Sequence, residues 1–205
     1  MPLIVVANPK GGVGKSTVST HVAAYLASQG KRVVLADADV QQSVLGWLAI
    51  RPTGAAPIKG WNARAEEGLS LPAKADCVVL DTPAGLHGRV LKDVVKTATK
   101  VLVPVQPSIF DMTATRAFLE DLQERKKAQG LDIALVGMRV DQRTVASENL
   151  KDFLAGLGFP VLSCLRSTQN YVRLTMAGLT LFDVPAHRVE RDLADWQPIC
   201  DWLNR

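Results

Sequence analysis

The residues best suited to chemistry form one segment near the start of the chain, residues 8–17 (NPKGGVGKST). An apolar run, Leu3–Ala7, precedes it, and apolar residues with helical spacing follow it. A strand, a glycine-rich loop and a helix in this order form a phosphate-binding loop, because small glycines let backbone N–H groups surround phosphate oxygens. The segment therefore predicts a nucleoside triphosphate site, with Lys15 on the β- and γ-phosphates and Ser16 on Mg²⁺.

This loop departs from the general pattern G-x-x-x-x-G-K-[ST], because Pro9 stands at the first glycine position and Lys10 is an additional lysine. The variant resembles the deviant Walker A loop of the ParA/MinD family of ATPases. The resemblance covers nearly the whole chain and is closest to the short ParA proteins such as ParF. The alternative is a glycine-rich turn of an unrelated protein, and ten residues in this order after a strand argue against it. The loop residues expected to bind the nucleotide are Lys10, Gly11, Gly12, Val13, Gly14, Lys15, Ser16 and Thr17.

Two further segments place carboxylates after apolar runs. Asp37 and Asp39 follow Arg32–Ala36, and Asp81 ends Cys77–Asp81 in a Walker B arrangement, from which a carboxylate reaches Mg²⁺. By the resemblance, Asp39 orients the attacking water and Asp37 lies nearer the metal shell. The expected metal residues are thus Ser16, Asp37 and Asp81, and a solvated turn is the alternative for the first two acids.

The base-binding residues carry a weaker signal. The chain lacks the Asn-Lys-x-Asp motif of GTPases, which favours ATP. The resemblance implies that Met138 and Arg139, after one strand, and Pro107, after another, contact the adenine, although asparagine is common in the family at the first of these positions. A surface ion pair between Arg139 and Asp141 is the open alternative.

The elements that must position these residues alternate along the chain. Apolar runs predict strands over Leu3–Asn8, Arg32–Ala36, Cys77–Asp81, Val101–Val105, Ile133–Met138 and Val161–Cys164. Helical spacing predicts helices over Ser16–Gln29, Gly88–Ala98, Met112–Gln129, Ser147–Leu157, Gln169–Ala177 and Glu190–Asn204. The alternation predicts a doubly wound α/β fold of P-loop NTPase type, a mostly parallel sheet with helices on both faces. We expect one ATPase domain over residues 1–205, with Arg51–Lys74 as a surface excursion that has little structure of its own.

Composition limits where the protein is expected to work and which partners it can have. No apolar run reaches the roughly 18 residues of a membrane span, and no secretory signal precedes the loop, so we expect a cytoplasmic protein without membrane insertion. Three cysteines without CxxC spacing are expected to be reduced thiols. A net charge of +4 permits a polyanionic partner without requiring one.

The resemblance implies a switch. Lys10 reaches the phosphates of a second subunit in a face-to-face homodimer that forms with ATP, and Lys10, Lys15 and Asp39 are the catalytic residues. Hydrolysis is then slow, is accelerated by an activating adaptor protein, and releases the subunits. A scaffold that binds ATP without hydrolysing it is the alternative, and a turnover assay separates the two.

The function implied is the partitioning or positioning of a cargo, which could be a plasmid, a chromosome region or a protein cluster. The ATP dimer would bind DNA without sequence preference and associate with the nucleoid, with Arg166 and Arg173 as candidate contacts. Ordinary solvated arginines are the alternative for both. A MinD-like factor bound to a membrane or protein surface is the alternative function, but acids oppose the apolar face of the C-terminal helix, which predicts packing on the domain.

Overall fold

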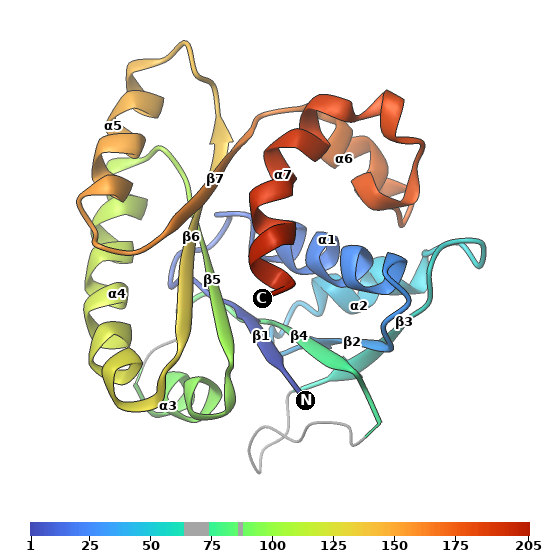
Figure 1. The fold of residues 1–205 in the computed structure, drawn as a ribbon, viewed down its shortest axis with the longest axis horizontal. Coiled ribbons are helices and arrows are strands. Elements are labelled where there is room, and N and C mark those ends of the chain that lie inside the picture. The colour runs from blue at the N-terminus through green and yellow to red at the C-terminus, as the bar shows by residue number, and fades with distance from the viewer. Residues whose placement is uncertain (64–73, 86–87) are drawn as a thin grey trace.

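The fold is a parallel sheet between two layers of helices. The structure, a computed structural model, describes residues 1–63, 74–85 and 88–205. Within these residues one sheet has the strand order β3-β2-β4-β1-β5-β6-β7, and every neighbouring pair is parallel (Figure 1). The strands are β1 (Leu3–Val6), β2 (Val33–Asp37), β3 (Ile58–Asn62), β4 (Cys77–Asp81), β5 (Lys100–Val105), β6 (Asp132–Val140) and β7 (Val161–Arg166). The helices are α1 (Lys15–Ser28), α2 (Ser43–Ala49), α3 (Gly88–Thr97), α4 (Ile109–Gln129), α5 (Val145–Ala155), α6 (Gln169–Met176) and α7 (Glu190–Leu203), with short 3₁₀ turns at Leu181–Asp183 and Ala186–Arg188.

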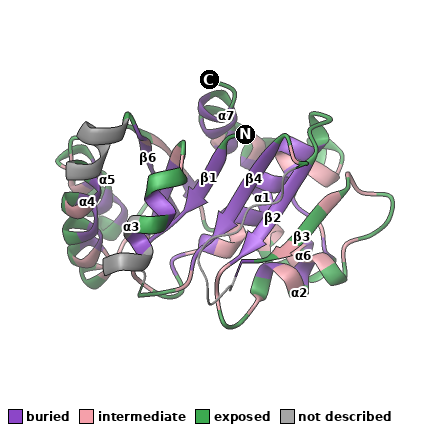
Figure 2. Cartoon of the chain, turned by 90° about the horizontal axis from the view of Figure 1, so that it is seen from below, coloured by how far each residue is buried: buried purple, intermediate pink, exposed green. Residues whose placement is uncertain are grey.

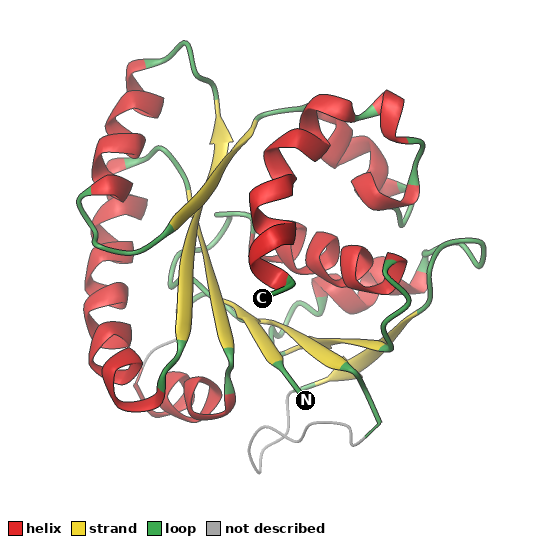
Figure 3. Ribbon diagram, viewed as in Figure 1, coloured by secondary structure: helices red, strands yellow, loops and turns green. Residues whose placement is uncertain are grey.

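The central strands are buried on both faces, which explains their unbroken apolar sequences. Every residue of β1, β2 and β4 is buried. Figure 3 shows α3, α4 and α5 on one side of the sheet and α1, α2, α6 and α7 on the other, and Figure 2 shows the buried strands between them. Each side has its own apolar core, with Leu119 and Leu122 of α4 in one and Val22 of α1 and Trp196 of α7 in the other. The predicted doubly wound α/β fold is confirmed.

Two elements were missed by the sequence reading. The expected surface excursion Arg51–Lys74 contains β3, which pairs in parallel with β2 from Ile58↔Val33 to Asn62↔Asp37. Proline and glycine residues around it obscured an edge strand in which only Ile58 and Trp61 are half-buried and the other residues are exposed. Helix α2 packs on this strand, since a Cβ at Gly60 would lie 3.0 Å from Leu45 Cδ2. Residues 64–73 of the predicted excursion lie outside the described residues.

The C-terminal helix packs on the domain, as expected from its acidic outer face. In α7, Trp196, Ile199 and Trp202 are buried. Among the described residues, no helix is long and apolar enough to cross a membrane.

Candidate functional site

Strand register brings the predicted motifs to one edge of the sheet. Val6 of β1 and Asp37 of β2 both align with Asp81 of β4, so these strands end at the same level. The backbone N–H of Ala38 donates to the carbonyl oxygen of Asp81 (3.0 Å), which joins the two acidic strand ends. Ligands of open parallel sheets bind at the carboxyl ends of the strands, which is where these residues meet.

The glycine-rich loop has a backbone that only glycine adopts readily. Gly12 and Gly14 have φ angles of +75° and +98°, in the left-handed region. A Cβ at Gly14 would also lie 2.7 Å from Cε of Met138. Helix α1 begins directly after Gly14, so its positive dipole end faces the loop. This combination of a tight loop and a helix N-terminus suits a bound phosphate group.

Lys15 is held inside the loop. Its side chain is nearly buried, and Nζ donates to the carbonyl oxygen of Lys10 (2.7 Å). Burial lowers the pKa of Lys15, while the carboxylates of Asp81 and Asp39 act in the opposite direction. The ammonium group therefore lies within the field of both acids and can exchange a loop carbonyl for phosphate oxygens.

Asp81 joins the loop through two hydroxyl groups. Ser16 Oγ donates to Oδ2 of Asp81 and Ser19 Oγ donates to Oδ1, each at 2.8 Å. Burial raises the pKa of Asp81 to about 6, and the two serine hydroxyls oppose this shift. A carboxylate beside a serine hydroxyl provides the oxygen ligands that Mg²⁺ prefers, so these residues fit the expected ion. Ser19 was missed by the sequence reading, although its spacing of three residues from Ser16 places both on one helix face.

Asp37 has its carboxylate committed to the backbone. It is fully buried, and it accepts hydrogen bonds from the N–H groups of Asp39 (2.9 Å), Val44 (3.1 Å) and Leu45 (3.4 Å). Burial raises its pKa despite these bonds. Asp37 thus anchors the start of α2 and the loop that carries Asp39, and its expected role near the metal remains a prediction.

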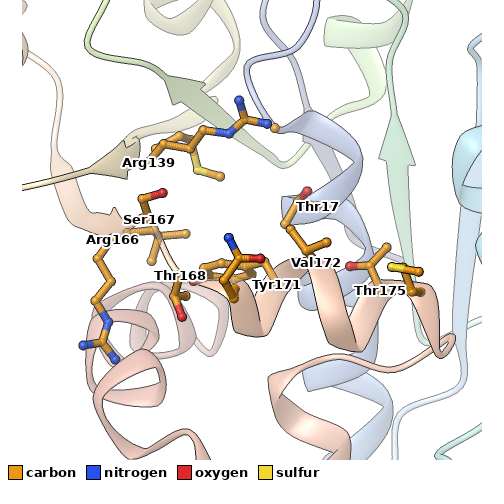
Figure 4. A pocket seen from close by; sticks show the side chains of 13 residues that line it. Thr17, Arg139, Arg166, Ser167, Thr168, Tyr171, Val172 and Thr175 are labelled. Carbon is orange, nitrogen blue, oxygen red and sulfur yellow. The ribbon is translucent and has the colours of Figure 1, made fainter.

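A cavity of about 550 Å³ lies beside the phosphate loop (Figure 4). Gly14 and Thr17 form one wall, and Met138 and Arg139 at the end of β6 lie where a base contact was predicted. Pro107 does not line this cavity. The alternative ion pair does not form either, because Asp141 pairs with Arg143 (2.9 Å).

The remaining wall was not recognised in the sequence. It consists of the end of β7 and the exposed face of α6, including Ser167, Thr168, Tyr171 and Val172. These residues belong to no short motif. Their only local signal is the cap of α6, where Thr168 accepts a hydrogen bond from the N–H of Asn170.

The two arginines expected at DNA differ in their surroundings. Figure 4 shows the Arg166 guanidinium pointing away from the cavity, and it pairs with fully buried Asp192 (2.7 Å). Asn170 also donates to this carboxylate (2.5 Å). Arg166 therefore supports the cavity wall, a structural role that the sequence reading did not give it. Arg173 is exposed and donates to Asn170 Oδ1 (3.0 Å).

Known proteins are similar to this chain in sequence and in fold. Residues 4–181 match the CobQ/CobB/MinD/ParA nucleotide binding domain. The maintenance of carboxysome distribution protein A of Gloeobacter kilaueensis is 29% identical over 208 residues, which cover 99% of this chain and 94% of that protein. The chromosome-partitioning ATPase Soj of Thermus thermophilus is 28% identical over 183 residues, covering 72% and 73%. A plasmid partition protein of Borrelia burgdorferi solved with AMPPNP superposes with a TM-score of 0.76 at 18% identity, covering 98% of each chain. The chain belongs to the CobQ/CobB/MinD/ParA family of nucleotide-binding domains.

Proposed function

We propose that this protein is a ParA/MinD-type ATPase that dimerises with ATP, hydrolyses it slowly, and uses this cycle to position a cargo. One observation carries the proposal: Lys15, the Ser16–Asp81 pair and the Asp39 loop meet at one sheet edge, beside a cavity large enough for a nucleoside. We propose that residues 1–205 form one ATPase domain.

The chemistry needed is positioning and charge neutralisation rather than covalent catalysis. Lys15 and the loop amides stabilise charge on the β- and γ-phosphates, and Asp39 orients the attacking water. Ser16 and Asp81 would hold Mg²⁺, which would supply positive charge to the phosphates. Lys10 reaches the phosphates of the second subunit, so ATP favours the dimer over the monomers.

The names of the relatives support the cargo-positioning part of the proposal. Two of them are named for carboxysome distribution and chromosome partitioning, which supports cargo positioning. We propose that the ATP dimer binds DNA without sequence preference in the cytoplasm, on the nucleoid, and that an adaptor protein stimulates hydrolysis. The buried apolar face of α7 gives no support to the membrane-bound alternative, because Trp196, Ile199 and Trp202 pack inside the domain.

The first test measures the mass in solution of the Asp39→Ala protein with Mg·ATP and with Mg·ADP, each with and without duplex DNA. We expect a dimer with ATP only, bound to DNA and released by added salt. A monomer with both nucleotides would contradict the dimer. An ATP-dependent dimer that does not bind DNA would contradict the proposed DNA binding and would leave ATP-dependent dimerisation unaffected.

A charge reversal then tests the DNA surface. Arg166→Glu is unsuitable, because it would place a second carboxylate against buried Asp192. Arg173→Glu should keep the dimer and weaken DNA retention, since it removes a phosphate contact. Lys31→Glu makes the same charge change just before β2, at the amino-terminal ends of the strands, and serves as the matched control. Equal effects of the two variants would remove Arg173 from the DNA contact.

A further inference from the structure

The side chain of Asn8, two residues after the end of β1, uses all its hydrogen-bonding groups inside the protein. It is fully buried, and its Nδ2 donates to the carbonyl oxygen of Pro104 (2.8 Å) and to Thr115 Oγ1 (2.9 Å). Its Oδ1 accepts from the backbone N–H of Lys10 (2.9 Å). The Thr115 hydroxyl donates its own proton to the carbonyl oxygen of Asp111 (2.7 Å), so its oxygen is available as an acceptor. The amide therefore has one satisfied orientation, with its oxygen toward Lys10.

A second side chain near the end of β5 bonds to the phosphate loop at Gly12, two residues after Lys10. Gln106, just after β5, donates from Nε2 to the carbonyl oxygen of Gly12 (2.7 Å). Between these two anchors, the carbonyl oxygen of Lys10 accepts from Lys15 Nζ (2.7 Å). Both backbone polar groups of Lys10 are thus bonded in this structure. When Lys15 exchanges the Lys10 carbonyl for phosphate, the bonds of Asn8 and Gln106 still hold the backbone on either side of Gly11.

We infer that Asn8, Thr115 and Gln106 are positioning residues that aim the side chain of Lys10 at a second copy of this chain. The inference rests on the role proposed above for Lys10. A small rotation of its backbone moves the ammonium group much further, because four methylene groups separate the two. Held in place, the lysine loses less conformational freedom when the dimer forms. The two loop groups that the network holds, the N–H of Lys10 and the carbonyl oxygen of Gly12, are not donors available to phosphate. We therefore expect the network to act on dimer formation more than on ATP binding by the monomer.

Thr115 gives a test with a matched control. Thr115→Val keeps the shape of the side chain but removes the acceptor for Asn8, whereas Thr115→Ser keeps the hydroxyl group. Both are made in the Asp39→Ala background, which accumulates the ATP state. ATP affinity is measured on dilute monomer with a fluorescent ATP analogue, and dimer affinity by sedimentation with Mg·ATP.

We expect Thr115→Val to weaken dimer affinity roughly tenfold while ATP affinity stays within about twofold. Thr115→Ser should restore the dimer, which a general loss of packing would not allow. Gln106→Met tests the second anchor at a partly exposed position, should the buried valine variant fail to fold. It removes the donor to Gly12 and should weaken the dimer in the same selective way.

Other outcomes would overturn the inference. Dimer affinity unchanged in Gln106→Met and Thr115→Val would show that the anchors do not aim Lys10, and so would equal loss of dimer in Thr115→Val and Thr115→Ser. Lys10→Ala in the same assay separates this inference from the proposed function. If Lys10→Ala dimerises normally, the proposed role of Lys10 fails and takes the inference with it. If only Lys10→Ala weakens the dimer, the inference fails and the role of Lys10 stands.

Discussion

The phosphate side and the base side of the candidate site are built in different ways. On the phosphate side, short side chains at adjacent strand ends bond to one another, as in the Ser16–Asp81 contact at 2.8 Å. On the base side, much of the cavity wall is α6, which lies more than 150 residues after the phosphate loop in the chain. Contacts with α7 hold this wall in place. Asp192 anchors the start of that wall through Arg166, and Tyr171 accepts a hydrogen bond from Trp196 Nε1 (2.9 Å).

A buried histidine connects the two sides. His21, on α1, contacts the carbonyl oxygen of Thr17 through Nδ1 (2.8 Å), and its ring stacks on Trp196 with centroids 5.2 Å apart. Burial lowers the pKa of His21 to about 4, so the ring is neutral at physiological pH. The phosphate loop and the base wall therefore share one aromatic core. We expect changes on the phosphate side to remove chemistry or binding, and changes on the base side to alter affinity by smaller factors.

The largest effect is expected at Asp39. Asp39→Ala should lower the turnover number about 1,000-fold, because a positioned carboxylate no longer orients the attacking water. ATP binding should remain, since Lys15 and the loop are unchanged. Steady-state phosphate release measures the rate. Asp141→Ala removes an acid that pairs with exposed Arg143 away from the loop and is the control. Normal hydrolysis by Asp39→Ala would remove this residue from the chemistry.

Lys15 should have the next largest effect, on binding. Lys15→Ala removes an ammonium group that bonds inside the loop, and we expect ATP affinity to fall roughly 100-fold. A titration with a fluorescent ATP analogue measures this loss. Lys10→Ala is the matched control, because its monomer should bind ATP normally and fail only in dimer formation. If both variants bind alike, the two lysines do not have the separate roles proposed here.

Asp81 gives a pH-dependent difference on the phosphate side. Its pKa rises to about 6 in the folded protein, from 3.8 ordinarily, so the folded state holds this proton more tightly than the unfolded state. Lowering the pH from 8 to 5 without nucleotide should therefore stabilise the wild type relative to Asp81→Asn, by about 1.4 kcal/mol. Thermal unfolding of both proteins across this range measures the difference. A stability difference between the two proteins that does not change with pH, or that favours the wild type more as the pH rises, would contradict the raised pKa of Asp81.

Mg²⁺ should show the opposite pH dependence at the same residue, because an oxygen ligand for the ion must be ionised. Mg·ATP affinity of the wild type should fall as the pH drops below about 6, following the pKa of Asp81. Ser19→Ala should move this midpoint upward, since the Ser19 hydroxyl stabilises the ionised form. An unchanged midpoint would show that the Ser19 bond does not tune the carboxylate.

The contrast between the phosphate side and the base side also explains which parts of the molecule could be predicted from the sequence. The phosphate loop and its neighbouring acids could be placed because strand ends and glycine conformations depend on short segments. Five of the six predicted strands were found because buried parallel strands read as apolar runs. The sixth, β7, was found from a short apolar run, although most of its residues are only partly buried. Edge strand β3 was missed because none of its residues is fully buried, so its sequence carries no such run.

The base wall could not be predicted for a related reason. Thr168 and Tyr171 line the cavity only because α6 packs against α1 and α7, and nothing near them in the sequence encodes that contact. Arg166 carries the same charge whether it meets DNA or a buried carboxylate. Its partner, Asp192, is 26 residues away in the chain. Tertiary packing determines both the α6 wall and the partner of Arg166. Motifs and spacing in a single sequence do not show which distant segments pack together.

The smallest effect is expected where this packing supports the wall. Asp192→Asn keeps the shape of the side chain but removes the charge that holds Arg166, which is partly exposed and can turn to solvent. We expect roughly fivefold weaker ATP binding, with unchanged turnover at saturation, because only ground-state contacts to the base change. Affinity for inorganic triphosphate should stay constant, since it uses the phosphate side alone. Asp201→Asn, an exposed acid on the same helix, is the control. Equal losses for ATP and triphosphate in Asp192→Asn would mean that the two sides respond as one unit through the shared aromatic core, and the separation drawn here would not hold.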